Sequence, residues 1–132
     1  MSQDKRIKVL LVGRDELFGD SMKMYLNSKG FEVWATETFE AGLEHLSRIP
    51  SDLIISEHGR SSTEALRFFG EVNKLRLAPQ AYKIIICDAC TPETECDGLK
   101  QHADFCIAKP LTREIVDRMV GHVFEFFGKK KQ

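Results

Sequence analysis

The sequence predicts an α/β fold, a doubly wound parallel sheet of five strands alternating with five helices. Short, almost wholly apolar runs recur along the 132 residues, as in strands that are covered on both faces. The segments between these runs place apolar residues at helical spacing. No internal repeat or low-complexity segment interrupts the alternation. A single layered α/β domain follows from this pattern.

The expected strands are apolar runs bounded by polar or turn-forming residues. The run from Tyr82 to Cys87 is the most β-prone, because it contains three consecutive isoleucines and β-branched residues favour strands. The five expected strands are residues 7–12, 31–35, 53–56, 82–87 and 105–108.

The expected helices carry apolar residues three and four positions apart. Gly30 ends the first helix and Pro50 ends the second, since neither residue continues a helix readily. The helix expected after Thr91 is the weakest, because Cys96 and Leu99 are its only apolar anchors. The helical segments are residues 15–29, 39–49, 65–75, the stretch after Thr91, and 115–127.

Composition places the chain among ordinary soluble domains. Hydrophobic residues make up 42% and charged residues 30% of the sequence, which is typical of a globular protein. The formal net charge of -1 argues against a nucleic-acid partner, and no apolar stretch is long enough for a membrane span. The first residues do not resemble a signal peptide, so we expect a cytoplasmic protein. Residues 1–128 form the expected domain, and residues 129–132 a basic tail or the start of a linker.

Four cysteines raise the alternative of a metal or redox protein. Cys87 and Cys90 have the C-x-x-C spacing, with Cys96 and His102 following. Structural zinc sites usually combine two such pairs, and here the first cysteine lies inside an expected strand. Reduced thiols, without a metal or a cofactor, are therefore the expected state, and Cys106 is expected to pack as a small apolar residue.

The ends of the first and third expected strands carry the residues of most interest. Residues 13–16 contain one glycine, one arginine and two acids, which suits a bound phosphate poorly. No Gly-x-Gly-x-x-Gly motif is present either. Glu57 follows the strand at residues 53–56 directly. In doubly wound folds, ligands bind at the edge of the sheet formed by the carboxyl ends of the strands. Glu57 is therefore a candidate functional residue.

The order of several short motifs resembles the receiver domain of bacterial two-component response regulators. The sharpest match is Ala103 to Leu111, ADFCIAKPL, which is similar to the family segment containing Lys-Pro after strand five. Residues 8–12, 29–33 and 52–55 add further matches in the same order. The resemblance covers residues 8–127, and it implies a flavodoxin-like strand order 2-1-3-4-5.

The same resemblance implies a phosphorylation site in which most of the residues needed for phosphoryl transfer are replaced. In the family, an aspartate accepts a phosphoryl group from a histidine kinase, and two acids after strand one help it to hold Mg²⁺. Here Glu57 replaces the acceptor, Gly13 and Arg14 replace the acid pair, and only Lys109 is retained. The degenerate phosphorylation pocket is expected to comprise Gly13, Arg14, Asp15, Glu57, Asp88, Cys106 and Lys109.

We therefore expect an atypical receiver, a pseudo-receiver, that is not an enzyme and signals without phosphorylation. Glu57 reaches one methylene further than aspartate and crudely imitates an acyl phosphate, in partly exposed ion pairs with Arg14 and Lys109. Neutral drift to an inert ion-pair cluster is the competing interpretation. A second function remains open, a phosphotransfer-competent receiver that uses Asp88 or Asp15 as its acceptor.

The expected partner is an unidentified signalling protein or an output domain. Receivers typically signal through the face formed by helix four, strand five and helix five, and a homodimer through this face is a second arrangement. The residue at 106 is an aromatic switch in the family and a cysteine here, which would uncouple this face from the pocket. The candidate interaction face comprises Cys96, Leu99, Lys100, Cys106 and Arg118.

Overall fold

Five parallel strands form one sheet in the order β2-β1-β3-β4-β5. The computed structural model describes residues 6–13, 16–57, 63–87, 103–108 and 111–130. The strands are β1 (Lys8–Val12), β2 (Glu32–Thr36), β3 (Leu53–Glu57), β4 (Tyr82–Cys87) and β5 (Phe105–Ala108). The flavodoxin-like order expected for the chain is thus confirmed, and each strand lies within about two residues of its predicted bounds.

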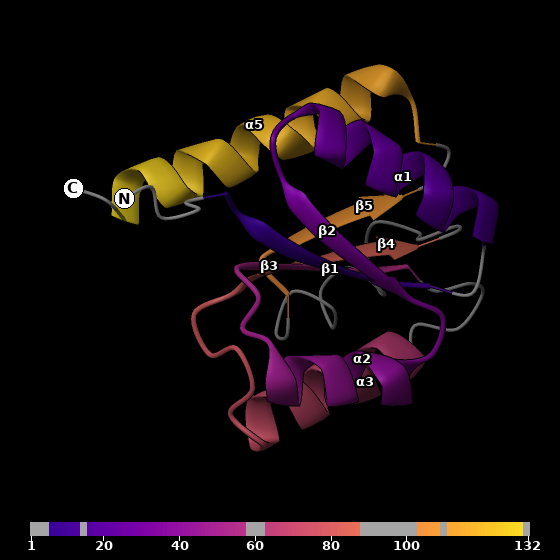
Figure 1. Ribbon diagram of the computed structural model, residues 1–132, viewed down its shortest axis with the longest axis vertical. Coiled ribbons are helices and arrows are strands. Elements are labelled where there is room, and N and C mark those ends of the chain that lie inside the picture. The colour runs from indigo at the N-terminus through magenta and orange to yellow at the C-terminus, as the bar shows by residue number, and fades with distance from the viewer. Residues whose placement is uncertain (1–5, 14–15, 58–62, 88–102, 109–110, 131–132) are drawn as a thin grey trace.

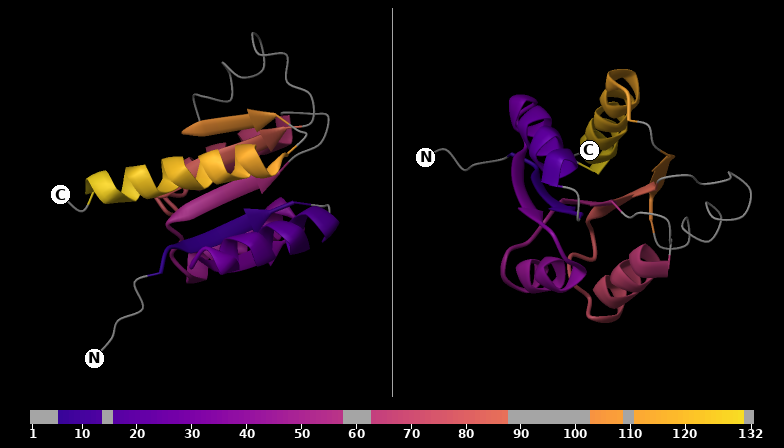
Figure 2. Two further views of the ribbon diagram at one scale, coloured as in Figure 1. Left: turned by 90° about the horizontal axis from the view of Figure 1, so that it is seen from above. Right: turned by 90° about the vertical axis from the view of Figure 1, so that its right-hand side faces the viewer.

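Helices cover both faces of this sheet (Figure 1). The described helices are α1 (Glu16–Ser28), α2 (Phe39–Arg48), α3 (Thr63–Lys74) and α5 (Arg113–Lys130). Figure 2 shows α1 and α5 together on one face, with α2 and α3 on the other. The helix predicted after Thr91 lies outside the described residues. Helix α5 runs to Lys130, so it includes the first half of the segment 129–132, which the sequence predicts to be a basic tail or the start of a linker.

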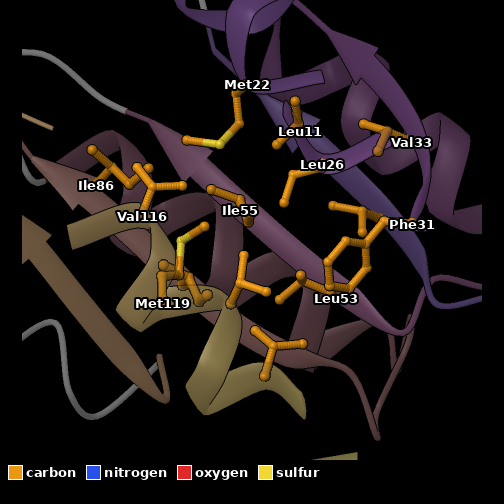
Figure 3. Close-up of a cluster of buried hydrophobic side chains, with 14 of the residues drawn as sticks. Leu11, Met22, Leu26, Phe31, Val33, Leu53, Ile55, Ile86, Val116 and Met119 are labelled. Atoms are coloured by element: carbon orange, nitrogen blue, oxygen red, sulfur yellow. The ribbon is translucent and has the colours of Figure 1, made fainter. Parts of the chain in front are cut away.

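The face under α1 and α5 is packed with aliphatic, methionine and aromatic side chains, among them Phe31 (Figure 3). Val9, Leu11, Leu53 and Ile55 point into it from β1 and β3, as alternate residues of a strand must. Tyr25 of α1 also donates a hydrogen bond to the Asp117 carboxylate of α5. The two helices therefore hold each other as well as the sheet.

On the opposite face, under α2 and α3, a group of phenylalanine rings packs among aliphatic side chains. Phe39 stacks on Phe68 with ring centroids 5.1 Å apart, and Phe68 meets Phe69 edge-on at 5.2 Å. Gly42 lets α2 approach the sheet closely, because a Cβ there would lie 3.0 Å from Val12 Cγ2 and 3.2 Å from a Phe68 ring carbon. A larger residue at position 42 would push the helix away from β1.

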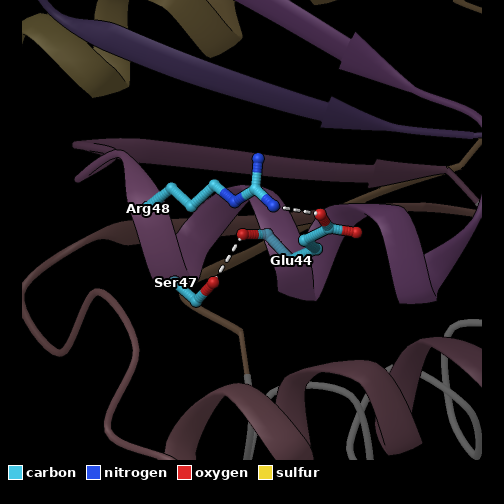
Figure 4. A network of polar contacts seen from close by, with 3 residues as sticks. All are labelled: Glu44, Ser47 and Arg48. Carbon is cyan, nitrogen blue, oxygen red and sulfur yellow. Dashed lines mark hydrogen bonds and ion pairs between the residues drawn. The ribbon is translucent and has the colours of Figure 1, made fainter.

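Local signals set the helix ends. Gly30 follows α1 with φ +94°, a conformation that glycine adopts without a steric penalty. Thr38 caps α2 by accepting a hydrogen bond from the Ala41 N–H at 3.0 Å. On the outer side of α2, Arg48 pairs with Glu44 at 2.8 Å (Figure 4). Both side chains are mostly exposed, so this pair contributes little to stability.

Two aspartates close the strand pairs at the amino edge of the sheet, where the strands begin. The Asp52 N–H donates to the Lys8 carbonyl at 2.8 Å, and the Lys8 N–H donates to Asp52 Oδ2 at 2.9 Å. Asp104 repeats this arrangement with Lys83, through bonds of 2.7 Å and 2.8 Å. Each aspartate thereby satisfies a backbone N–H at the start of a strand, where the ladder would otherwise leave it unpaired.

Candidate functional site

The candidate site lies at the carboxyl edge of the sheet, where the strands end. Val12 is opposite Ser56 in the register of β1 and β3, so Gly13 and Glu57 are the next positions on two adjacent strands. The Gly13 N–H donates to the Thr36 carbonyl at 3.0 Å, which holds the end of β1 against β2. Glu57 itself pairs with Ile86 of β4. The sheet thus fixes both backbones side by side.

The Glu57 side chain lies over Gly13 and is buried. Only 7% of Glu57 is exposed, and its Oε1 is 2.8 Å from the place that a Cβ on residue 13 would take. The expectation of a partly exposed Glu57 is therefore wrong. The glycine at position 13 contributes to this burial, since it leaves a space next to Glu57 that the longer side chain enters.

The resemblance to receiver domains implies a Mg²⁺ ion at this edge of the sheet. Mg²⁺ prefers carboxylate and water oxygens in near-octahedral arrangement. Gly13 offers no side-chain oxygen, and the space above it is taken by the Glu57 carboxylate. Among the residues that the structure describes, no group of three His, Cys, Asp or Glu side chains could hold a metal ion. The described part of the site does not fit the ion.

Ser56 adds a feature that the sequence did not suggest. Its side chain is fully buried, and its Oγ has no hydrogen-bond partner within the described ranges. Ser56 precedes Glu57 and therefore points to the opposite face of the sheet, toward α2 and α3. A polar residue inside an otherwise apolar strand was the only signal for it.

The remaining predicted site residues are described only in part. Cys106 lies half-buried on β5 and is not part of a disulfide, and it packs against the side chains under α2 and α3. Arg118 lies exposed on α5. The structure therefore brings together Gly13 and Glu57, and it places Cys106 and Arg118 on neighbouring elements. The predicted residues outside the described ranges are Arg14, Asp15, Asp88, Lys109, Cys96, Leu99 and Lys100.

A pocket of about 700 Å³ lies at the other edge of the sheet. Ile7, Phe31 and Asp52 line it from the strand starts, and Phe124 lines it from α5. Asp52 and Phe31 belong to the amino edge, so this pocket is separate from the Glu57 site. Across the described parts of the chain, no helix combines the length and apolar character needed to cross a bilayer.

Solved structures of receiver domains resemble this fold over nearly its whole length. No protein-family model and no curated protein sequence matches the chain. A CheY-like response regulator receiver domain protein from Methanospirillum hungatei has a TM-score of 0.78 at 24% identity, with 95% of this chain and 99% of that chain covered. The orphan response regulator HP1043 of H. pylori has a TM-score of 0.76 at 25% identity, with 92% and 99% covered.

A third similar structure is the chemotaxis response regulator CheY4 of Vibrio cholerae. Its TM-score is 0.80 at 19% identity, and the match covers 90% of this chain and 99% of that chain. The chain therefore has the CheY-like, flavodoxin-like fold of receiver domains.

Proposed function

We propose that this chain is a receiver-like signalling module of a two-component or related pathway, and that it works through protein contacts without accepting a phosphoryl group. It is then a binding module and not an enzyme. Three features support the proposal: the fold, the Glu57 side chain at the acceptor position, and the glycine at the first position of the acid pair.

The fold supports the signalling part of the proposal. The similar solved structures are response regulators, and one of them is described as an orphan response regulator. Folds host many functions, so the likeness sets the class of module and the site residues must decide its chemistry.

The buried Glu57 carboxylate is the main support for the proposal that the chain accepts no phosphoryl group. Phosphoryl transfer needs an oxygen that the donor can approach in line, together with a metal that neutralises the developing charge. The Glu57 carboxylate lies over Gly13 with 7% of the residue exposed. In that position it is poorly placed as a nucleophile, and it fills the side where a metal-binding acid would stand.

Intact mass spectrometry tests this proposal directly. The purified chain is incubated with acetyl phosphate or phosphoramidate and Mg²⁺, with a conventional receiver domain treated in parallel. We expect the conventional domain to gain the mass of one phosphoryl group and this chain to gain none. A phosphoryl group recovered on Asp88 or Asp15 would establish the alternative, a receiver with a non-standard acceptor.

We further propose that the partner, a signalling protein or an output domain, docks on the face that includes β5 and α5. Arg118 is exposed on α5, whereas Arg67 is exposed on α3, on the far side of the sheet, and serves as a matched control. After affinity capture of a partner from the source cell, Arg118→Glu should weaken its binding more than Arg67→Glu or Glu57→Ala.

The opposite ranking would assign the partner to the pocket. If Glu57→Ala abolishes binding while Arg118→Glu leaves it intact, the docking face is wrong. Sedimentation of the same variants tests the remaining arrangement, in which the partner is a second copy of the chain.

A further inference from the structure

The backbones of Gly13 and Glu57 are both held by the pairing of neighbouring strands. Gly13 is held by its N–H bond to the Thr36 carbonyl at 3.0 Å. Glu57 is the last residue of β3, which lies between β1 and β4 inside the sheet. Any group added at position 13 must therefore be accommodated by side chains, because the strands on both sides hold the main chain.

The Glu57 side chain takes up the space that such a group would need. A Cβ on residue 13 would lie 2.8 Å from Glu57 Oε1 and 3.2 Å from Glu57 Cβ. Carbon atoms in contact prefer a separation of about 3.5–4.0 Å. The carboxylate can rotate away from the first contact, but Glu57 Cβ is tied to the strand and cannot.

We infer that Gly13 is the positioning residue for Glu57. Its missing side chain makes the space that holds the carboxylate in its buried place, so a side chain at position 13 and the present Glu57 conformation exclude each other. The inference deepens the proposed function and rests on it for its meaning, since a phosphorylation-independent site is one that needs no room for an acid or a metal at position 13.

The two positions are then coupled. Restoring an acid by Gly13→Asp alone displaces the Glu57 carboxylate, and shortening Glu57 alone leaves a space over a glycine that offers no metal ligand. Neither single substitution recreates a metal site, because each change needs the other.

A double-mutant cycle tests the coupling, with urea unfolding as the measurement. The variants are Gly13→Ala, Glu57→Ala and the combination. Gly13 does not have the positive φ that disfavours other residues, and alanine at such a position usually stabilises a protein through the unfolded chain. We expect Gly13→Ala to lower the urea midpoint in the presence of Glu57, and to leave it unchanged or raise it in the Glu57→Ala background.

Gly19→Ala on α1 is the matched control. A Cβ at that position meets nothing within 4 Å, and alanine favours helix more than glycine does. Its midpoint should rise by the same amount with Glu57 or with alanine at position 57. An equal effect of Gly13→Ala in both backgrounds would overturn the inference.

A second readout covers the case in which Glu57→Ala fails to fold. The ¹³C resonance of the Glu57 carboxyl group should move in Gly13→Ala and stay in place in Gly19→Ala. An unmoved resonance in Gly13→Ala would also overturn the inference. Since the intact-mass test uses the unsubstituted chain, the two proposals fail separately. If the chain gains a phosphoryl group while Gly13 and Glu57 are coupled, only the proposed function is rejected. If the chain gains none and the two positions are not coupled, only the positioning role of Gly13 is rejected.

Discussion

The two edges of the sheet use carboxylates in different ways. At the amino edge, Asp52 and Asp104 accept hydrogen bonds from the backbone N–H groups of Lys8 and Lys83. At the carboxyl edge, the Glu57 carboxylate lies over the space left by Gly13. The first two carboxylates complete the strand pairing, whereas the third occupies the position where the fold usually places its chemistry.

This difference distinguishes carboxylates that complete the strand pairing from the carboxylate that lies at the candidate site. An aspartate that completes a strand pair is required by the backbone around it, because its loss leaves a donor unpaired. The Glu57 side chain depends on the shape of its neighbour, because it lies in the space over a glycine. Substitutions at the amino edge should therefore have the larger effect on stability, while those at the carboxyl edge should act mainly on the conformation of Glu57.

The largest expected effect is at Asp52. Asp52→Ala should lower the free energy of unfolding by about 1–3 kcal/mol, because the partly buried Lys8 N–H loses its acceptor. Asp52→Asn keeps an acceptor oxygen and should cost less. Asp104→Ala should also cost less, since Asp104 is exposed and water can replace its carboxylate. Urea unfolding measures all three variants, and a Glu57→Gln loss larger than that of Asp52→Ala would contradict the comparison.

An intermediate effect is expected from His45, which lies in the last turn of α2 on the way back to the amino edge. Burial lowers the pKa of His45 below its ordinary value of 6.5, and its ring contacts Trp34 with centroids 5.3 Å apart. The unfolded chain therefore binds this proton more readily than the folded chain does. The contribution of neutral His45 to the free energy of unfolding should be fully present above pH 6.5. It should decrease as the pH falls from 6.5 to the lowered pKa of the folded state.

His45→Gln isolates this contribution, because glutamine does not titrate. Urea midpoints measured near neutrality and at about pH 5.5 should differ less in the variant than in the original chain. An unchanged pH dependence in His45→Gln would assign the effect to other groups.

The smallest effect, none, is expected at the carboxyl edge on addition of Mg²⁺. A ligand that binds the folded state at ten times its Kd raises stability by about 1.4 kcal/mol, and Gly13 removes one of the acids that binding would need. The melting temperature should therefore not rise with Mg²⁺ beyond a control matched for ionic strength. A saturable rise would show that other residues rebuild the metal site.

Hydrophobic pattern alone predicts the layered fold, and the motifs around Ala103 and Asp52 add the strand order. Apolar runs and helix-spaced residues mark elements because burial on a sheet is local in sequence. The pattern could not predict the burial of Glu57, because that depends on which strand lies next to β3 and in what register. The family resemblance places positions 13 and 57 in one pocket, but the contact between them depends on the pairing of β1 with β3.

The same limit applies to the amino edge. Asp52 and Asp104 stand immediately before their strands in the sequence, where they contributed to the family resemblance. Their hydrogen bonds to Lys8 and Lys83 depend on neighbours that are far away along the chain, 44 residues in the first case. A sequence pattern can mark such a residue as recurrent, but the physical reason appears only in the folded sheet.

Asp52 also links the starts of β1 and β4 across the centre of the sheet. Its N–H donates a hydrogen bond to the Lys8 carbonyl of β1, and its Oδ2 accepts one from the Lys8 N–H. Its carbonyl accepts a hydrogen bond from the Tyr82 N–H of β4 at 2.9 Å. An opening that releases any one of these amides must break contacts that hold the others. In hydrogen-exchange terms, we expect the Lys8, Asp52 and Tyr82 amides to belong to one cooperative unit. They should therefore exchange with solvent at similar, slow rates, as three strands that separate together.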